Sequence, residues 1–294
     1  MIKLLRLPLA LLCCALSACV TQTIREGTDL STSGIAYTQA VHALLDATTT
    51  EVIDFDNKEL IKGRMSSDPG GALAQRDQAM AALLAEIAQF RAQTLLLKAY
   101  FVNLQALADS SVKDDAGPAV QSLSDTISKL NVSLGRKQLL TPEQSQQVGA
   151  LAGLAAQAVQ AEKIRRALRR DAPVIGTYLA LQQQQLVNIT AILKDRYGAE
   201  QALFHAEKVA APYANLKQPL DPAWADARKQ WLMSAFSNQQ LDAANAAAEQ
   251  LRGVWADIVQ GKNDIGALSD LIGDIDQFVT TADALKSASA KPKP

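Results

Sequence analysis

The sequence predicts an all-α protein, an elongated antiparallel bundle of about seven helices with coiled-coil-like packing. Hydrophobic residues make up 48% of the chain but aromatic residues only 5%, and the abundant Ala, Leu and Gln lose little on entering a helix. Apolar residues recur in alternating steps of three and four, which favours shallow helix crossings and hence an elongated bundle. Short loops make consecutive helices antiparallel neighbours. No repeat of fixed period occurs, which argues against a solenoid.

The first two helices are predicted on either side of a glycine-rich loop. The first spans residues 32–63 and includes the β-branched stretch 48–55, which could alternatively form a strand. Residues 63–71 are a loop by their glycine and proline content. In the second helix Leu84, Leu95 and Val102 widen the apolar face, so we expect it to contact more than one neighbour. The seam of the second helix consists of Met80, Leu83, Ile87, Phe90, Thr94, Leu97, Phe101, Leu104 and Ala108.

The third and fourth helices follow a polar break at residues 109–118. The third carries an apolar seam from Val120 to Leu134. The fourth begins at Thr141-Pro142-Glu143-Gln144, because Thr141 suits the N-cap, Pro142 the first turn and Gln144 the capping box. Asp171-Ala172-Pro173 is expected to end the fourth helix and to cap the fifth.

The remaining helices are separated by proline and glycine. The fifth begins at Ile175 and continues toward Val209, and prolines between 212 and 222 mark the next connection. A sixth helix starts at Asp221-Pro222 and is closed by Gly261, and a seventh begins at Ile265. We expect residues 32–285 to form one helical domain and residues 286–294 a disordered tail.

The N-terminus has the composition of a secretory signal. Lys3 and Arg6 give it a positive start, an apolar run from Leu7 to Leu16 follows, and small residues lead to Cys19. The apolar run is too short to span a membrane. An ordinary cleaved signal with an incidental cysteine is the alternative interpretation.

Leu16-Ser17-Ala18-Cys19 resembles the lipobox of bacterial lipoproteins. The resemblance covers only the signal region. It implies that residues 1–18 are removed, that Cys19 is lipidated, and that residues 19–31 are a lipidated tether. Val20 stands where many lipoproteins retained in the inner membrane have Asp, which implies the outer membrane, on the periplasmic side. More than one acyl chain is needed to hold a protein stably.

Charge and cysteine content exclude some functions. Without residues 1–18 the chain has 27 basic and 30 acidic side chains, a net charge of −3, which gives no electrostatic reason to expect nucleic acid. Cys13 and Cys14 lie in the signal, so lipidated Cys19 would be the one cysteine left. We therefore expect no disulfide and no thiol chemistry.

No motif in the sequence points to catalysis, a metal or a cofactor. His42, with Asp46 one turn later, is the nearest approach to such a site, but a boundary histidine beside a surface carboxylate is the simpler interpretation. Asp54, Asp56 and Glu59 form an acidic cluster that could serve a hydrolase, although a solvated helix face explains it better. Phosphate loops, dinucleotide fingerprints and the Gly-x-Ser-x-Gly motif are absent.

One dense basic cluster offers a possible interaction surface. It comprises Arg165, Arg166, Arg169 and Arg170, with Lys163. Favourable charge at a helix C-terminus is the simpler interpretation, and contact with anionic lipid, peptidoglycan or an acidic protein is the functional one.

Three tryptophans and one glutamine have similarly divided interpretations. Trp224, Trp231 and Trp255 could line a ligand groove, but at this spacing they are more often core residues. Gln182 lies on an apolar stripe and should find a buried partner.

Three functions remain open at this point. The leading hypothesis is a lipid-anchored, non-enzymatic scaffold or binding protein of the cell envelope, attached to the membrane through its lipid and to a protein partner. An immunity or inhibitor lipoprotein against a toxin or cell-wall enzyme would need the same fold and address. A carboxylate-based hydrolase around Asp54 or Glu59 is the third. The sequence leaves the oligomeric state open.

Overall fold

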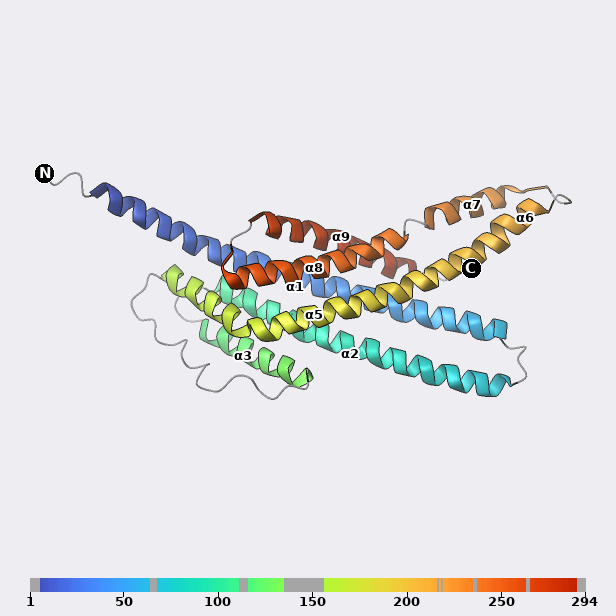
Figure 1. The fold of residues 1–294 in the computed structure, drawn as a ribbon, viewed down its shortest axis with the longest axis horizontal. Helices are drawn as coiled ribbons and strands as arrows, with labels where there is room; N and C mark the ends of the chain where they lie inside the picture. Colours follow the sequence, from blue (N-terminus) through green and yellow to red (C-terminus); the bar gives the residue numbers. More distant parts are fainter. Residues whose placement is uncertain are drawn as a thin grey trace. The chain divides into compact units, whose positions relative to one another are not determined.

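The computed structural model describes residues 6–63, 68–110, 116–134, 156–215, 217, 219–234, 237–262 and 265–289 (Figure 1). No strand occurs among these residues, so the all-α bundle prediction is confirmed, and residues 48–55 are helical. Within the described part, no helix is both long enough and apolar enough to cross a membrane. The helices are α1 (Arg6–Gly63), α2 (Pro69–Asp109), α3 (Ala116–Ser133), α5 (Ala156–Phe204), α6 (Ala211–Ala214), α7 (Pro222–Ser234), α8 (Ser237–Gln260) and α9 (Ile265–Ser289), with a π-helical segment η2 (His205–Ala210) joining α5 to α6.

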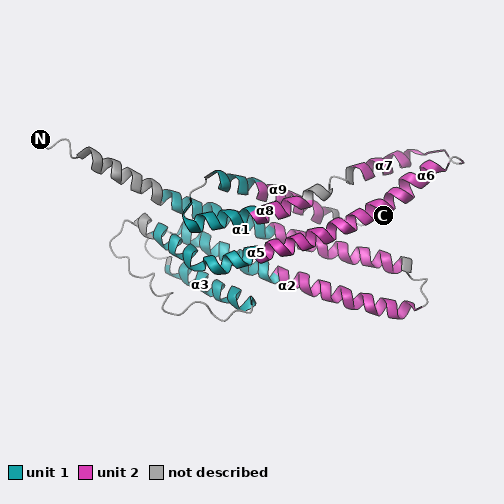
Figure 2. Ribbon diagram, in the orientation of Figure 1, with its two compact units in different colours: residues 1–39, 92–180, 250–273 teal, residues 40–91, 181–249, 274–294 magenta. Residues whose placement is uncertain are grey.

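The chain divides into two compact units, and the five longest described helices each contribute to both (Figure 2). Unit 1 comprises residues 1–39, 92–180 and 250–273. Unit 2 comprises residues 40–91, 181–249 and 274–294. Each unit is therefore assembled from segments that are distant in the sequence.

Unit 1 has an aromatic core at the middle of α2. The fully buried ring of Tyr100 packs edge-on against Phe101 and Trp255, with centroid distances of 5.7 and 5.9 Å. At the end of α2 the buried Gln160 side chain of α5 donates to the backbone oxygens of Ala108 at 2.5 Å and Ser110 at 2.9 Å. These bonds satisfy groups that a helix C-terminus otherwise leaves unpaired.

Unit 2 packs α1 and α2 in opposite directions, as predicted for consecutive helices. Asp46 pairs with Arg91 and Asp56 pairs with Arg76, so positions rise along α1 as they fall along α2. Its core is formed by apolar side chains from five helices. Among them are Leu44, Leu45, Val52, Phe90, Leu186, Leu193, Leu241, Ala244 and Phe278.

The N-terminal part of α1 differs from the expected polar tether. Residues 21–31 are helical and packed into unit 1, where Leu30 and Ser31 are fully buried. The Thr28 hydroxyl donates to the Ile24 oxygen and the Ser31 hydroxyl to the Thr28 oxygen, at 3.1 and 2.9 Å. Because these hydroxyl groups are satisfied within the helix, a polar sequence can be buried here.

The predicted break at Asp171-Pro173 is wrong, because α5 continues through it. Pro173 lies inside the helix, where a proline costs about 3 kcal/mol. Apolar side chains are buried on both sides of it, including Leu168 and Ile175, so packing outweighs this cost. The predicted helix start at residues 141–144 lies outside the described residues.

Two predicted boundaries are confirmed, and one is not. At the predicted start of α7 the Asp221 carboxylate accepts from the Trp224 amide at 2.9 Å. The expected loop 63–71 is wrong at its end, because α2 begins at Pro69 and the Asp68 carboxylate accepts from the Gly71 amide at 3.0 Å. Gly261 ends α8 with a φ of 74°, which favours glycine. The expectation of disorder from residue 286 is wrong as far as Ser289, because α9 extends to that residue, and residues 290–294 lie outside the described residues.

Candidate interaction surfaces

An apolar stripe on α2 in unit 1 faces away from the core. It consists of Ala92, Leu95, Ala99, Val102 and Ala106, which follow a/d heptad spacing, and we call it the α2 outer stripe. Leu95 is 53% exposed and Val102 44%, while the three alanines are exposed or half-buried. The described neighbours of α2 therefore leave this second apolar face largely exposed.

The edges of the α2 outer stripe are polar and carry one charge. Asn103 donates to the Thr126 hydroxyl of α3 at 3.0 Å, and Gln105 to the Thr32 hydroxyl of α1 at 3.3 Å. Lys98, which is half-buried, is the only ionisable lysine, arginine, aspartate or glutamate between residues 92 and 106. The stripe is thus an apolar seam beside a positive charge.

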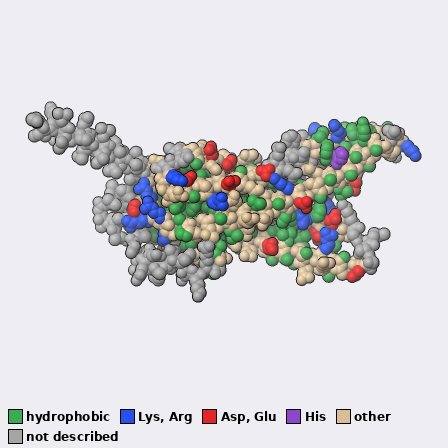
Figure 3. All heavy atoms as spheres, in the orientation of Figure 1, with side chains coloured by type: hydrophobic (Ala, Val, Ile, Leu, Met, Phe, Trp, Pro, Cys, Tyr) green, Lys and Arg blue, Asp and Glu red, His purple; other side chains and the backbone are tan. Residues whose placement is uncertain are grey.

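The basic cluster predicted on α5 lies in mid-helix and not at a helix end, because α5 continues to Phe204. Basic side chains gather on the surface over the N-terminal part of α5 (Figure 3). Arg165 donates to the Thr23 hydroxyl of α1 at 2.6 Å, and Arg166 pairs with Glu162 at 2.8 Å. Arg166 and Arg169 are exposed, whereas Arg170 turns into unit 1. The four arginines therefore differ in exposure and in the groups that they contact.

Asp171, which we expected to cap a helix, is fully buried and forms an ion pair with Arg170. The guanidinium donates to both carboxylate oxygens, at 2.7 and 3.1 Å, and to the Ser124 hydroxyl of α3 at 3.0 Å. Burial raises the pKa of Asp171, although Arg170 and the nearby Tyr100 hydroxyl oppose this shift. Burial and the negative charge of Asp171 also raise the pKa of Tyr100. The arrangement links three helices and holds a buried charge.

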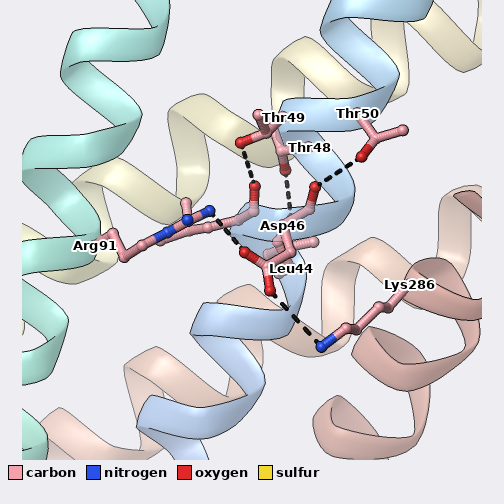
Figure 4. A network of polar contacts seen from close by, with 8 residues as sticks. Leu44, Asp46, Thr48, Thr49, Thr50, Arg91 and Lys286 are labelled. Carbon is pink, nitrogen blue, oxygen red and sulfur yellow. Dashed lines mark hydrogen bonds and ion pairs between the residues drawn. The ribbon is translucent and has the colours of Figure 1, made fainter. Parts of the chain in front are cut away.

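Asp46, one turn after His42 on α1, belongs to a surface network in unit 2 (Figure 4). The Asp46 carboxylate contacts Arg91 of α2 at 2.7 Å and Lys286 of α9 at 3.7 Å. The three threonines that follow, residues 48–50, donate to backbone oxygens one turn earlier. Asp46 thus joins three helices at the surface, in agreement with the simpler interpretation.

The acidic cluster on α1 is partly engaged by cations. Asp56 pairs with Arg76 at 3.0 Å. On the same helix Lys58 pairs with Glu200 at 2.6 Å, and Arg196 lies 4.7 Å from the centre of the Phe55 ring. Among the described side chains, no three of His, Cys, Asp and Glu gather as metal ligands would. The geometry gives the carboxylate-hydrolase hypothesis no added support.

The three tryptophans divide between a core and a surface. Trp255 is buried in unit 1. Trp224 and Trp231 lie half-buried on α7, where Trp224 stacks on Tyr213 of α6 with a centroid distance of 5.5 Å and Trp231 lies 4.3 Å from the His205 ring. We call η2, α6, α7 and their connection the aromatic hairpin. Gln182, as expected from its place on the apolar stripe of α5, is fully buried.

Comparison with protein-family models, with curated proteins and with solved structures gives no match to this chain. The Cys19 side chain lies outside the described side chains, so its lipidation stays a prediction. The arguments for function therefore come from the signal region and from the surfaces above.

Proposed function

We propose that this chain is a lipid-anchored, non-enzymatic binding or scaffold protein of the bacterial cell envelope. Lipid on Cys19 would attach it to the periplasmic face of the outer membrane, and the α2 outer stripe would bind a helix of another envelope protein. The observation that carries the binding role is the exposure of Leu95 and Val102, one heptad apart on a helix whose opposite face is already buried.

A helical partner suits the geometry of the α2 outer stripe. Positions with a/d spacing form a seam into which side chains of a second helix can insert, and alanines at the a positions permit a close approach. Exposed apolar side chains grouped in this way are typical of interaction surfaces. Burying Leu95 and Val102 would supply part of the binding energy.

The charge beside the stripe favours a different protein over a second copy of this chain. Antiparallel pairing of two copies about Ala99 would bring the two Lys98 side chains close together, and like charges across a helix pair repel. A partner helix with acidic flanking residues would instead pair with Lys98. We therefore infer an amphipathic helix with Asp or Glu beside its apolar seam.

Site-specific photocrosslinking in intact cells of the native host tests this proposal. A photoreactive phenylalanine replaces Leu95 or Val102 in the full chain, and Arg252, an exposed residue of α8 in unit 1, serves as the control position. We expect one shared adduct from the two stripe positions and none from Arg252. Equal adducts at all three positions, no adduct at either stripe position, or an adduct with a second copy would contradict the proposal.

A further inference from the structure

We infer that the aromatic hairpin is a second membrane-contacting element, whose tip enters the headgroup region of an anionic lipid bilayer. The described residues of the tip are 209–215, 217, 219 and 220, and the described part of the hairpin lies within unit 2. This inference depends on residues other than Cys19 and the α2 outer stripe.

The aromatic hairpin buries few of its described side chains. Among its described residues only Val209 is buried. Tyr213 is 64% exposed, and Leu220 and Leu232 are each 44% exposed. Hydrophobic side chains are visible on the surface over α6 and α7, with basic side chains beside them (Figure 3). A hairpin that remained in water would gain by covering these groups.

The aromatic contacts of the hairpin suit the boundary between water and lipid. Trp224 donates its indole N–H to the Val209 oxygen at 3.0 Å, so its polar atom is satisfied within the hairpin. Its ring stacks on Tyr213 with an interplanar angle of 23°. Tyr and Trp, which combine a large apolar ring with one polar atom, are enriched where a membrane meets water.

Charges are arranged so that the tip is the most apolar part of the hairpin. Lys217 is the only charged residue between Val209 and Leu220, and it is exposed. Asp221, directly after the tip, caps α7 through the Trp224 amide. The other charged residues of the hairpin lie behind the tip. They are Glu207 and Lys208 on η2 and Asp226, Arg228 and Lys229 on α7.

This arrangement of apolar, aromatic and charged side chains favours a lipid bilayer over a groove on another protein as the binding surface. A helix that docks in a groove presents anchors along one face, at spacings of three, four and seven. Here Tyr213 lies on α6 and Leu220 lies in the connection that leads to α7, so the two side chains do not follow one helix face. An apolar end with amphipathic rings and one cation can insert shallowly while Lys217 meets anionic headgroups, without any helix spanning the membrane.

Flotation with lipid vesicles tests the inference on the chain from residue 19 onward, carrying Cys19→Ser so that no acyl chain is present. One set of vesicles contains about 30% phosphatidylglycerol in phosphatidylcholine, and the other contains phosphatidylcholine alone. The tip variant combines Tyr213→Ser with Leu220→Ser. The control combines Leu95→Ser with Val102→Ser on the α2 outer stripe, which removes apolar groups of similar exposure.

We expect the chain to float with the anionic vesicles and the tip variant to bind at least about tenfold more weakly, since two apolar contacts are lost. Lys217→Glu should weaken binding to anionic vesicles by about fivefold or more and leave binding to neutral vesicles unchanged. The stripe control should bind both sets of vesicles as the unsubstituted chain does. Circular dichroism of each variant shows whether its helices are retained.

Three results would overturn the inference. The first is that the chain without tip substitutions does not bind anionic vesicles. The second is equal binding by the tip variant and the stripe control. The third is a photoreactive group at position 213 that captures a protein in intact cells instead of lipid, which would assign the tip to a protein partner. None of these results bears on the α2 outer stripe, so the two proposals can fail separately.

Discussion

Of the described glycines in unit 1, Gly34 of α1 has the nearest neighbouring side chain, Phe101 of α2. Adding a single methyl group at Gly34 should therefore destabilise the protein. A Cβ on Gly34 would come within 2.5 Å of Phe101 Cδ1, whereas ordinary contacts of this kind are 3.4–4 Å. The Phe101 ring is fully buried and packs against Tyr100, so it has little room to withdraw. The ring or the helix axis must shift by about 1 Å.

The size of the effect follows from two opposing contributions. Overpacking a core costs about 1–3 kcal/mol, and the displacement of a whole ring places Gly34→Ala toward the upper end. Replacing Gly by Ala inside a helix contributes about 1 kcal/mol of stability. We therefore expect Gly34→Ala to lower the free energy of unfolding by about 1–2 kcal/mol.

Gly253→Ala in α8 is the matched control, because nothing lies within 4 Å of a Cβ at that position. Only the gain in helix propensity remains there, so Gly253→Ala should raise the free energy of unfolding by up to about 1 kcal/mol. Urea unfolding of the chain from residue 19, with Cys19→Ser, measures both variants. Stabilisation by Gly34→Ala as large as that by Gly253→Ala would refute the packing of residues 21–39 against α2 and would restore the tether interpretation.

Substitutions at three further positions test the interior and the surface of the bundle. Asp171→Ala should cost about 3–5 kcal/mol in urea unfolding, because it leaves the Arg170 charge largely buried without its partner; a loss below about 1 kcal/mol would contradict the buried ion pair. Burial raises the pKa of Asp171 in the folded chain, so just above the unfolded-state pKa the folded state binds more protons than the unfolded state. The free energy of unfolding of the unsubstituted chain, relative to that of Asp171→Asn, should therefore fall as pH rises through that window. A relative free energy of unfolding that grows with pH would contradict the raised pKa. Pro173→Ala should stabilise the chain by about 1–3 kcal/mol by restoring a helical hydrogen bond, and a higher midpoint in thermal unfolding is the expected result, whereas a lower one would show that the proline is needed. Lys58→Ala should change the urea midpoint little, by less than about 1 kcal/mol in free energy, since its pair with Glu200 is solvent-exposed, and a larger loss would show a stronger contribution than the geometry allows.

Heptad spacing made most of the fold predictable, because a long apolar seam leaves few alternatives to a packed helix. The α2 seam, the cap at Asp221 and the end at Gly261 follow from local rules that the structure obeys. The start of α2 at Pro69 does not follow, because it lies inside the expected loop 63–71. The structure of residues 21–31 was harder to predict. Ser and Thr in a helix can donate their hydroxyl hydrogen bonds to backbone oxygens of the preceding turn, and their side chains can then be buried. Composition alone does not distinguish such a segment from a tether.

The break expected at Pro173 illustrates a second limit of local reasoning. Proline and a preceding aspartate usually end a helix, but here Asp171 pairs with the neighbouring Arg170 and lies near Tyr100, a residue 71 positions earlier. Such partners are set by tertiary packing and leave no mark in the local sequence. The same error placed the arginine cluster at a helix end, although it lies within α5.

The surfaces were predictable in different degrees. The α2 outer stripe is a second a/d pattern in the sequence, and Leu95 and Val102 already indicated a widened face. Which of two apolar faces is left uncovered depends on how many neighbours pack against α2, and that only the structure shows. For the aromatic hairpin, the tryptophan spacing suggested core positions, whereas Trp224 and Trp231 belong to an element in which Val209 is the one buried residue among the described side chains.

Attachment through a lipid on Cys19 is the claim on which the proposed envelope function most depends, and metabolic labelling with an alkyne analogue of palmitate tests it most directly. Cells expressing the full chain or its Cys19→Ser variant are labelled, and the protein is purified from the membrane and soluble fractions. We expect label on the unsubstituted chain in the membrane fraction and none on Cys19→Ser. Equal labelling of both chains, or an unlabelled chain that keeps residues 1–18, would contradict the lipid anchor.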